Sequence, residues 1–194
     1  VIYSSSVAAL LPQAGTRKNR ADRRKVDGVI AVAWSQCEEL DRVRSTLPLV
    51  LIDSTTGYTD VPLVTADDEP GAYAATKHLI DLGHRRIAHL GSCFGSNPGR
   101  NRRDGYLRAL SEAGLQPDPS LIYEALWEFE DGYAGAQTML QRRPDVTAFF
   151  CSVDGVALGA MKYLHETGRH VPDDVSVVGF GGTATAELVS PGLT

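Results

Sequence analysis

Short apolar runs alternate with segments of helical spacing along this 194-residue chain. The apolar runs, each expected to be a strand, are Val26–Val32, Leu49–Ile52, Leu63–Thr65, Arg86–Leu90, Leu121–Tyr123, Val146–Cys151 and Val175–Val178. The segments expected to be helical are Glu38–Ser45, Asp67–Gly83, Arg100–Ala113, Asp131–Arg142 and Asp154–Thr167. Strands that alternate with helices form parallel sheets whose faces the helices cover. The pattern therefore predicts an α/β fold with doubly covered parallel sheet.

The ends of the expected helices carry several acidic residues. Asp67 or Asp68 can cap one helix, with Pro70 in its first turn and Gly83 at its end. Asp154 stands where it can cap a later helix. We therefore interpret these carboxylates first as helix caps, and not as acid–base pairs.

Composition and charge exclude several classes of function. Hydrophobic residues make up 43 % of the chain, which is typical of a globular protein, and no apolar run has the roughly 18 residues that a membrane span needs. The formal net charge of −5 is a poor match for the phosphates of DNA. Two basic clusters, residues 17–25 and 100–103, are expected to be solvated helix faces. We expect no membrane partner and no direct binding of this chain to nucleic acid.

Metal, cofactor and catalytic motifs give no positive signal. The cysteines Cys37, Cys93 and Cys151 are far apart, which favours neither a zinc site nor a disulfide framework, and the five histidines have no metal-ligand spacing. Cys93 and Cys151 end expected strands, where a buried thiol acts as a small apolar group. The chain also lacks the glycine-rich phosphate-binding motifs and the nucleophile-elbow motif. We expect no metal, no cofactor and no enzymatic activity.

Residues at the carboxyl ends of the strands are the first candidates for a binding site, because ligands bind at that edge of an open parallel sheet. Asp53 follows an expected strand directly. Trp127 lies in a loop between a strand and a helix, where an indole offers a stacking surface or packs under the loop. Arg102 lies in the first turn of its expected helix, where its donors either face a ligand or face solvent.

Several stretches, taken in order, resemble the effector-binding domain of the LacI/GalR family of bacterial transcription regulators. They are Val26–Ile30, Leu47–Asp53, His78–Ile87, Arg102–Tyr106 with Ala109–Leu110, Val171–Phe180 and Pro191–Thr194. Each stretch is weak by itself, but their order and spacing over most of the chain make the resemblance specific.

The resemblance implies a periplasmic-binding-protein-like fold of type I, with two Rossmann-like lobes and a small effector between them. Residues 1–84 are expected to form an incomplete N-terminal lobe, and residues 85–194 the C-terminal lobe with the start of the return crossover. A homodimer in the cytoplasm is implied, with operator DNA bound by an N-terminal helix–turn–helix headpiece. That headpiece, the first strand and helix of the effector domain, and the C-terminal stretch are expected to be absent from this chain.

Six residues match effector-site positions of the family. Asp53 matches an acidic contact, Arg102 matches the arginine that reaches the effector, and Trp127 matches the aromatic residue that stacks on it. Ser96 and Asn97 fall in the loop that rims the site. Asp154 matches the Asp of an Asn–Asp pair, with helix capping as its alternative role.

The chain departs from the family pattern in two segments. Gly181 and Gly182 follow Phe180 where the family usually has two aspartates, and Val153 replaces the Asn before Asp154. The loss of two polar contacts argues against a typical hexose and favours an effector that is smaller, less hydroxylated or charged.

The sequence thus predicts a ligand-sensing regulatory domain, with a sugar or related metabolite as its effector. A solute-binding protein of a sugar transport system has the same fold and stays the alternative, which an export signal would favour. An α/β enzyme is the third hypothesis, and it lacks a catalytic set of residues.

Overall fold

A computed structural model describes residues 27–32, 38–53, 57–91 and 97–194. The chain divides into two compact units, Val1–Ala66 and Asp67–Thr194, and each is described by itself. The division lies earlier than the lobe boundary expected near residue 84. The difference arises because the helix that begins at Asp68 packs along a helix of the second unit.

The first unit contains a three-stranded parallel sheet in the order β1-β2-β3. Its elements are β1 (Val29–Val32), α1 (Glu38–Thr46), β2 (Leu49–Ile52) and β3 (Leu63–Val64). One face of the sheet, with Ala31 and Leu51, forms a buried cluster with Leu40 and Val43 of α1. Ile30 and Val32 alternate with these residues and are about half exposed. The alternation therefore assigns one face of this sheet to the core.

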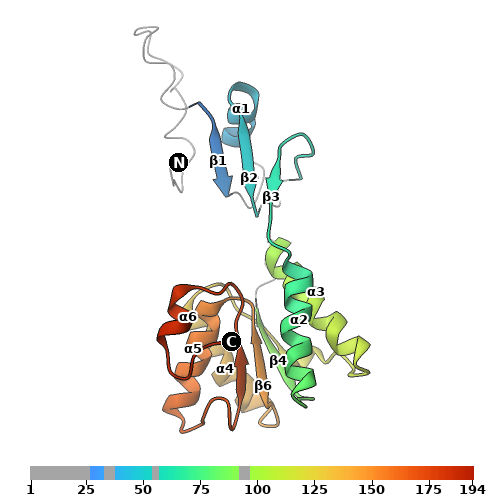
Figure 1. Ribbon diagram of the computed structural model, residues 1–194, viewed down its shortest axis with the longest axis vertical. Helices are drawn as coiled ribbons and strands as arrows, with labels where there is room; N and C mark the ends of the chain where they lie inside the picture. Colours follow the sequence, from blue (N-terminus) through green and yellow to red (C-terminus); the bar gives the residue numbers. More distant parts are fainter. Residues whose placement is uncertain (1–26, 33–37, 54–56, 92–96) are drawn as a thin grey trace. The chain divides into compact units, whose positions relative to one another are not determined.

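The second unit contains a four-stranded parallel sheet in the order β5-β4-β6-β7. The strands are β4 (Ile87–Gly91), β5 (Ile122–Glu124), β6 (Ala148–Cys151) and β7 (Ser176–Val178). The helices are α2 (Asp68–Asp81), α3 (Asn97–Glu112), η2 (Pro119–Leu121), α4 (Phe129–Arg142), α5 (Asp154–Glu166) and α6 (Ala184–Leu188). In Figure 1, α2 and α3 cover one face of this sheet and α4 and α5 the other. The α/β fold with doubly covered parallel strands is confirmed.

Side chains of the central strands alternate between two cores. Ala88 and Leu90 of β4 belong to the cluster that includes α4 and α5, whereas Ile87 joins Tyr106 of α3 and the other residues on the α2–α3 face. Every residue of β4 and β6 is buried. Such continuous apolar runs are typical of parallel strands with both faces covered.

The helix pair α4–α5 packs at very short range. A methyl group at Gly132 would overlap the main chain of Val156, and one at Gly159 would overlap the main chain of Phe129. The two glycines are reciprocal, because each lets the other helix approach its backbone. This contact fixes α5, the helix that carries Asp154, against α4.

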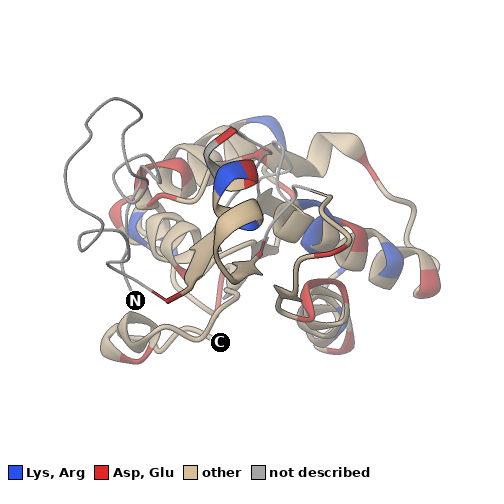
Figure 2. Ribbon diagram, turned by 90° about the horizontal axis from the view of Figure 1, so that it is seen from above, with Lys and Arg blue, Asp and Glu red and all other residues tan. Residues whose placement is uncertain are grey.

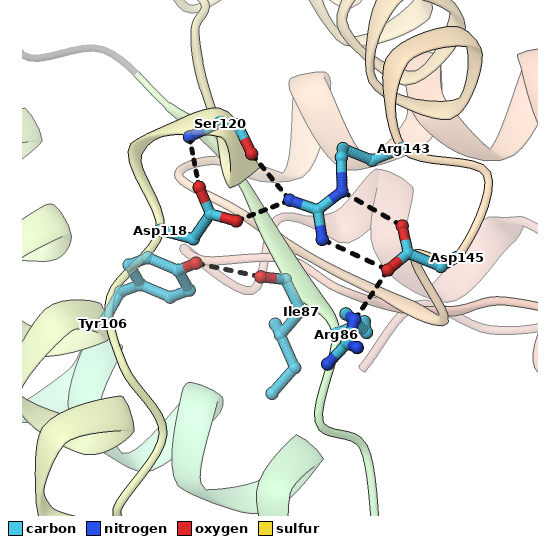
Figure 3. A network of polar contacts seen from close by, with 7 residues as sticks. All are labelled: Arg86, Ile87, Tyr106, Asp118, Ser120, Arg143 and Asp145. Atoms are coloured by element: carbon cyan, nitrogen blue, oxygen red, sulfur yellow. Dashed lines mark hydrogen bonds and ion pairs between the residues drawn. The ribbon is translucent and has the colours of Figure 1, made fainter.

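A charged network joins the loops at the amino-terminal edge of the second sheet (Figure 3). The Arg143 guanidinium bonds Asp118 at 2.6 Å and Asp145 at 3.1 Å, and Arg86 donates to Asp145 at 2.6 Å. Hydrogen bonds from Arg143, and then from Arg86, lower the pKa of Asp145 to about 2. The network therefore links the loops at the edge of the sheet opposite the carboxyl ends of the strands, where a ligand is expected to bind.

Charged residues of both signs are interspersed along the described helices (Figure 2). Ion pairs join many of the cations to carboxylates: Arg42–Glu38, Arg44–Asp60, Lys77–Asp81, Arg86–Asp145, Arg108–Glu69 and Lys162–Glu166. The expected solvated face at residues 100–103 is wrong for Arg102, which is buried, while residues 17–25 lie outside the described part. Within that part, none of the helices combines the length and apolar character that crossing a bilayer requires.

Two helices begin earlier than expected. α3 starts at Asn97 and not at Arg100. Pro98 fits in its first turn, because the N–H groups of a first turn have no partner within the helix and the missing N–H of proline therefore costs nothing there. α4 starts at Phe129 and not at Asp131. Glu128 and Asp131 form a capping box around its first turn, in which the Asp131 side chain accepts a hydrogen bond from the Glu128 N–H at 3.2 Å. The short helices η2 and α6 were not expected.

Candidate functional site

Arg102 lies at the carboxyl edge of the second sheet, where β4 and β6 end and α3 begins. Its Nε and Nη2 both lie 2.7 Å from Asp68 Oδ1, and its Nη1 donates to the Ser152 carbonyl oxygen at 2.8 Å. Asp68 is the first residue of α2, and Ser152 directly follows β6. Two separate elements, α2 and the end of β6, therefore hold the guanidinium that α3 carries.

Two aromatic rings also face this guanidinium. The Arg102 Cζ lies 4.0 Å from the centre of the Phe180 ring and 5.8 Å from the Trp127 ring. Phe180 follows β7, and Trp127 lies between β5 and α4. A cation over an aromatic face is attracted by the ring quadrupole, most strongly where water is excluded. The structure thus brings Arg102 and Trp127 together and adds Phe180.

The ion pair between Arg102 and Asp68 is buried. The Arg102 side chain is 10 % exposed, and the Asp68 side chain is 0 % exposed. Removing one partner of such a pair leaves an uncompensated buried charge, which typically costs about 3–5 kcal/mol. The pair therefore fixes the position of the guanidinium strongly.

The held guanidinium keeps donors available. Arginine has five N–H groups, and three of them point to Asp68 and Ser152. One N–H on each terminal nitrogen has no partner within the described residues. These two hydrogens can serve a ligand that offers acceptor atoms in the plane of the guanidinium.

Asp154 is buried at the start of α5 and serves the neighbouring loop. Its Oδ2 accepts a hydrogen bond from the Thr183 N–H at 2.6 Å, and its own N–H donates to the Phe180 carbonyl oxygen at 3.1 Å. The expectation that Asp154 caps its own helix is wrong, because Val153 holds the cap position and makes no side-chain cap bond. Asp154 instead fixes the segment that carries Phe180 and leads into α6.

The expected capping by Asp67 or Asp68 is also wrong. Asp67 holds the cap position of α2 but makes no side-chain cap bond, and Asp68 turns to Arg102. A tertiary ion pair has replaced a local hydrogen bond here. Asp68 is therefore part of the site and not a helix cap.

The other expected site residues lie as follows. Asn97 is the first residue of α3 and is half-buried, and Ser96 lies outside the described part. Asp53 belongs to the first unit, where it directly follows β2 with a φ of 46°. Its Oδ1 lies 3.4 Å from the Ala66 N–H. A positive φ is uncommon for a residue other than glycine, although Asp adopts it more readily than most.

His89 is a further buried polar residue near this edge. Its ring stacks between Tyr106 and Phe150, with ring centres 5.2 and 5.0 Å away, and its Nδ1 lies 3.1 Å from the Phe150 carbonyl oxygen. Burial lowers the pKa of His89 to about 4. The imidazole is thus neutral near pH 7, with its proton on Nδ1.

Sequence reasoning missed Asp68, Ser152, Phe180 and His89 as members of this edge. The only available signal was their place at strand or helix ends, which many residues share. Cys151 is a free, buried cysteine, as expected, and burial raises the pKa of its thiol; Cys37 and Cys93 lie outside the described part. Among the described residues, no three His, Cys, Asp or Glu side chains are grouped as metal ligands.

Comparison with known proteins gives consistent matches. Residues 76–194 match the family described as periplasmic binding protein-like domain. The HTH-type transcriptional repressor PurR of Mannheimia succiniciproducens is 33 % identical over 175 residues, which are 89 % of this chain and 52 % of that protein. The chain spans about half the length of the curated relatives it matches.

Two solved structures are similar over most of the chain. The transcriptional regulator CelR in complex with cellobiose has a TM-score of 0.76 at 32 % identity, covering 87 % of this chain and 53 % of that one. A LacI family transcriptional regulator from Mycobacterium smegmatis has a TM-score of 0.76 at 33 % identity, covering 88 % of this chain and 64 % of that one.

The parallel α/β units and the family match define the class: the chain belongs to the family of periplasmic binding protein-like domains. Within that class, its relatives and structural neighbours are regulators of the LacI type. The chain is thus an effector-binding domain of the LacI/GalR kind, as its sequence motifs predicted.

Proposed function

We propose that this chain is the ligand-sensing part of a bacterial transcription regulator, which binds a small metabolite and thereby controls operator binding. The observation that carries the proposal is Arg102, held by Asp68 and Ser152 beneath two aromatic rings at the carboxyl edge of a parallel sheet. The repressors among its relatives support the same function. These relatives do not favour the solute-transport alternative.

The proposal assigns roles to the expected site residues. Arg102 donates to the effector, and Trp127 packs against it. Asp53, Ser96, Asn97 and Asp154 are further contacts, with Asp154 acting through the segment that it holds. The effector is a sugar or a related metabolite, and CelR bound to cellobiose is one regulator of this fold with a sugar.

The wider assignment rests on the family resemblance of the sequence. We assign residues 1–84 and 85–194 to two lobes of one effector-binding domain in a cytoplasmic homodimer, with operator DNA bound by a separate headpiece. The chain is a sensor and not an enzyme, and it needs no cofactor. Its net charge of −5 agrees with DNA contacts made elsewhere.

Isothermal titration calorimetry tests the binding function. Sugars, sugar acids, nucleosides and purines are titrated into the chain and into Arg102→Ala and Trp127→Ala. Arg108→Ala is the matched control, because Arg108 lies on the same helix but pairs with Glu69 at a half-exposed position. We expect one compound class to bind, both site variants to weaken it at least tenfold, and the control to keep its Kd. Equal binding by all four proteins would refute the site.

A further inference from the structure

Two buried oxygens beside Arg102 have no hydrogen-bond partner within the described part of the chain. They are Asp68 Oδ2 and Ser152 Oγ. Each residue contacts the Arg102 guanidinium through its other oxygen, Asp68 through Oδ1 and Ser152 through its main-chain carbonyl. Buried polar atoms are nearly always hydrogen-bonded in native proteins, so two unbonded ones at a single guanidinium mark a place for a bound water or for a polar group of a ligand.

His89 brings a third polar atom to the same place. Its Nδ1–H donates to the Phe150 carbonyl oxygen, so Nε2 carries the lone pair and accepts. A methyl group at Gly91 would overlap His89 Nε2 and would lie 3.1 Å from the Ser152 Cβ. The imidazole Nε2 and the Ser152 side chain therefore flank the same point, at the end of β4. His89 is only 1 % exposed.

We propose that Asp68 Oδ2, Ser152 Oγ and His89 Nε2 form a polar floor under Arg102 that receives a hydrogen-bond-donating group of the effector, a hydroxyl or an N–H. This inference deepens the proposed function and rests on it. The carboxylate and the imidazole accept, and the serine hydroxyl both donates and accepts. Arg102 adds two donors at the side of this floor.

The arrangement of donors and acceptors selects a class of ligand. A matching compound is neutral and carries a donor group next to an acceptor group, as in a vicinal diol or in a ring with N–H beside C=O. A carboxylate or phosphate offers only acceptors and would bring a second negative charge next to Asp68. The floor therefore argues against the charged effectors that the sequence left open, although Arg102 alone would attract them.

Thr76 provides a matched control within the same helix. Its Oγ1 is also buried with no hydrogen-bond partner among the described residues, and the residue is 0 % exposed. It lies eight residues after Asp68 on α2, which places it about 12 Å further along the helix axis. Thr76→Val thus removes the same kind of hydroxyl from the same unit, away from Arg102.

The experiment titrates D-ribose, cellobiose, inosine and gluconate into the whole chain by calorimetry. Ser152→Ala, His89→Leu and Asp68→Asn are then titrated with the neutral probe that binds. We expect Ser152→Ala and His89→Leu each to raise Kd about threefold to tenfold, and Asp68→Asn to raise it about tenfold or more. Thr76→Val should keep the wild-type Kd, and gluconate should not bind.

Each other outcome overturns a defined claim. If a neutral probe binds the wild type and all three floor variants equally well, the polar floor is wrong and the proposed function stands. If gluconate is the probe that binds, the floor is also wrong, because its charge argument fails. If none of the probes binds, and the wider panel also fails, the proposed function falls and the floor falls with it.

Urea unfolding without ligand gives a second readout. Ser152→Ala should raise the unfolding free energy to a similar extent as Thr76→Val, because each variant removes a buried hydroxyl for which the described part of the chain offers no hydrogen-bond partner. A loss of stability in Ser152→Ala, alongside a gain in Thr76→Val, would show that the serine hydroxyl is bonded inside the ligand-free fold. That result would overturn the floor.

Discussion

Acid should destabilise the second unit through His89, and the size of the effect can be calculated. Burial lowers the pKa of His89 from 6.5 to about 4 in the folded chain. Above pH 6.5 the imidazole is neutral in both the folded and the unfolded states, so it adds no pH dependence. Between pH 6.5 and 4 only the unfolded chain binds the proton, and the unfolding free energy therefore falls as the pH falls.

The two pKa values give a loss of about 2 kcal/mol between pH 7 and pH 5, and about 3 kcal/mol once both states are protonated. Glu124 and Arg103 act on His89 in opposite directions, and both are weaker than burial. Carboxylates such as Asp145, with a pKa of about 2, remain ionised in the folded state at pH 5. Burial also lowers the pKa of His84, which adds a loss of the same sign, but only His89 has a large shift among the described histidines.

Urea denaturation at pH 7 and pH 5, followed by circular dichroism, measures the loss. His89→Leu removes the titrating group from the stack of rings and should reduce the loss by about 2 kcal/mol. His165→Leu, at an exposed position in the last turn of α5, is the matched control and should keep the wild-type dependence. An equal loss in the wild type and in His89→Leu would refute the assignment of a neutral, buried imidazole.

Three further predictions concern stability and reactivity. Gly159→Ala should lower the unfolding free energy by about 1–3 kcal/mol, because its methyl group meets the main chain of α4; an unchanged urea midpoint would contradict the close contact. Asp68→Ala should lower the unfolding free energy by about 3–5 kcal/mol, because it leaves the buried Arg102 charge without its partner, and Asp68→Asn should lower it less. Equal losses in the two variants would argue against a charge effect. In a Cys37→Ser, Cys93→Ser background, Cys151 should react with a thiol reagent only on unfolding, since burial raises its thiol pKa. Rapid labelling of the folded protein would show that it is accessible.

The sequence identified most strands and helices because their ends are chemically marked. β2 was predicted to the residue, since Pro48 precedes its apolar run and Asp53 follows it. The start of α3 was missed because Pro98 and Gly99 are usually found in turns, and only the tertiary setting makes them helical. Five-residue α6 has too few residues for any periodicity to show.

The site was predictable where a residue's role follows from its place along the chain. Arg102 and Trp127, which the structure brings together, were chosen because they flank strand ends, and their contact with an effector stays a prediction. Asp68 was assigned a local cap, since nothing along the chain connects it to an arginine 34 residues away. Ser152 contributes a main-chain oxygen, which carries no side-chain signal, and His89 lies within an apolar strand that predicts core packing.

The clamp on Arg102 has a consequence for selectivity. A free arginine loses about 2 kcal/mol of conformational entropy when a ligand immobilises it, but here folding itself has already restricted the side chain through Asp68, Ser152 and Phe180. The guanidinium also has little freedom to swing toward a poorly matched compound. A sensor with such a fixed arginine should bind few compounds and should discriminate sharply between chemically similar metabolites.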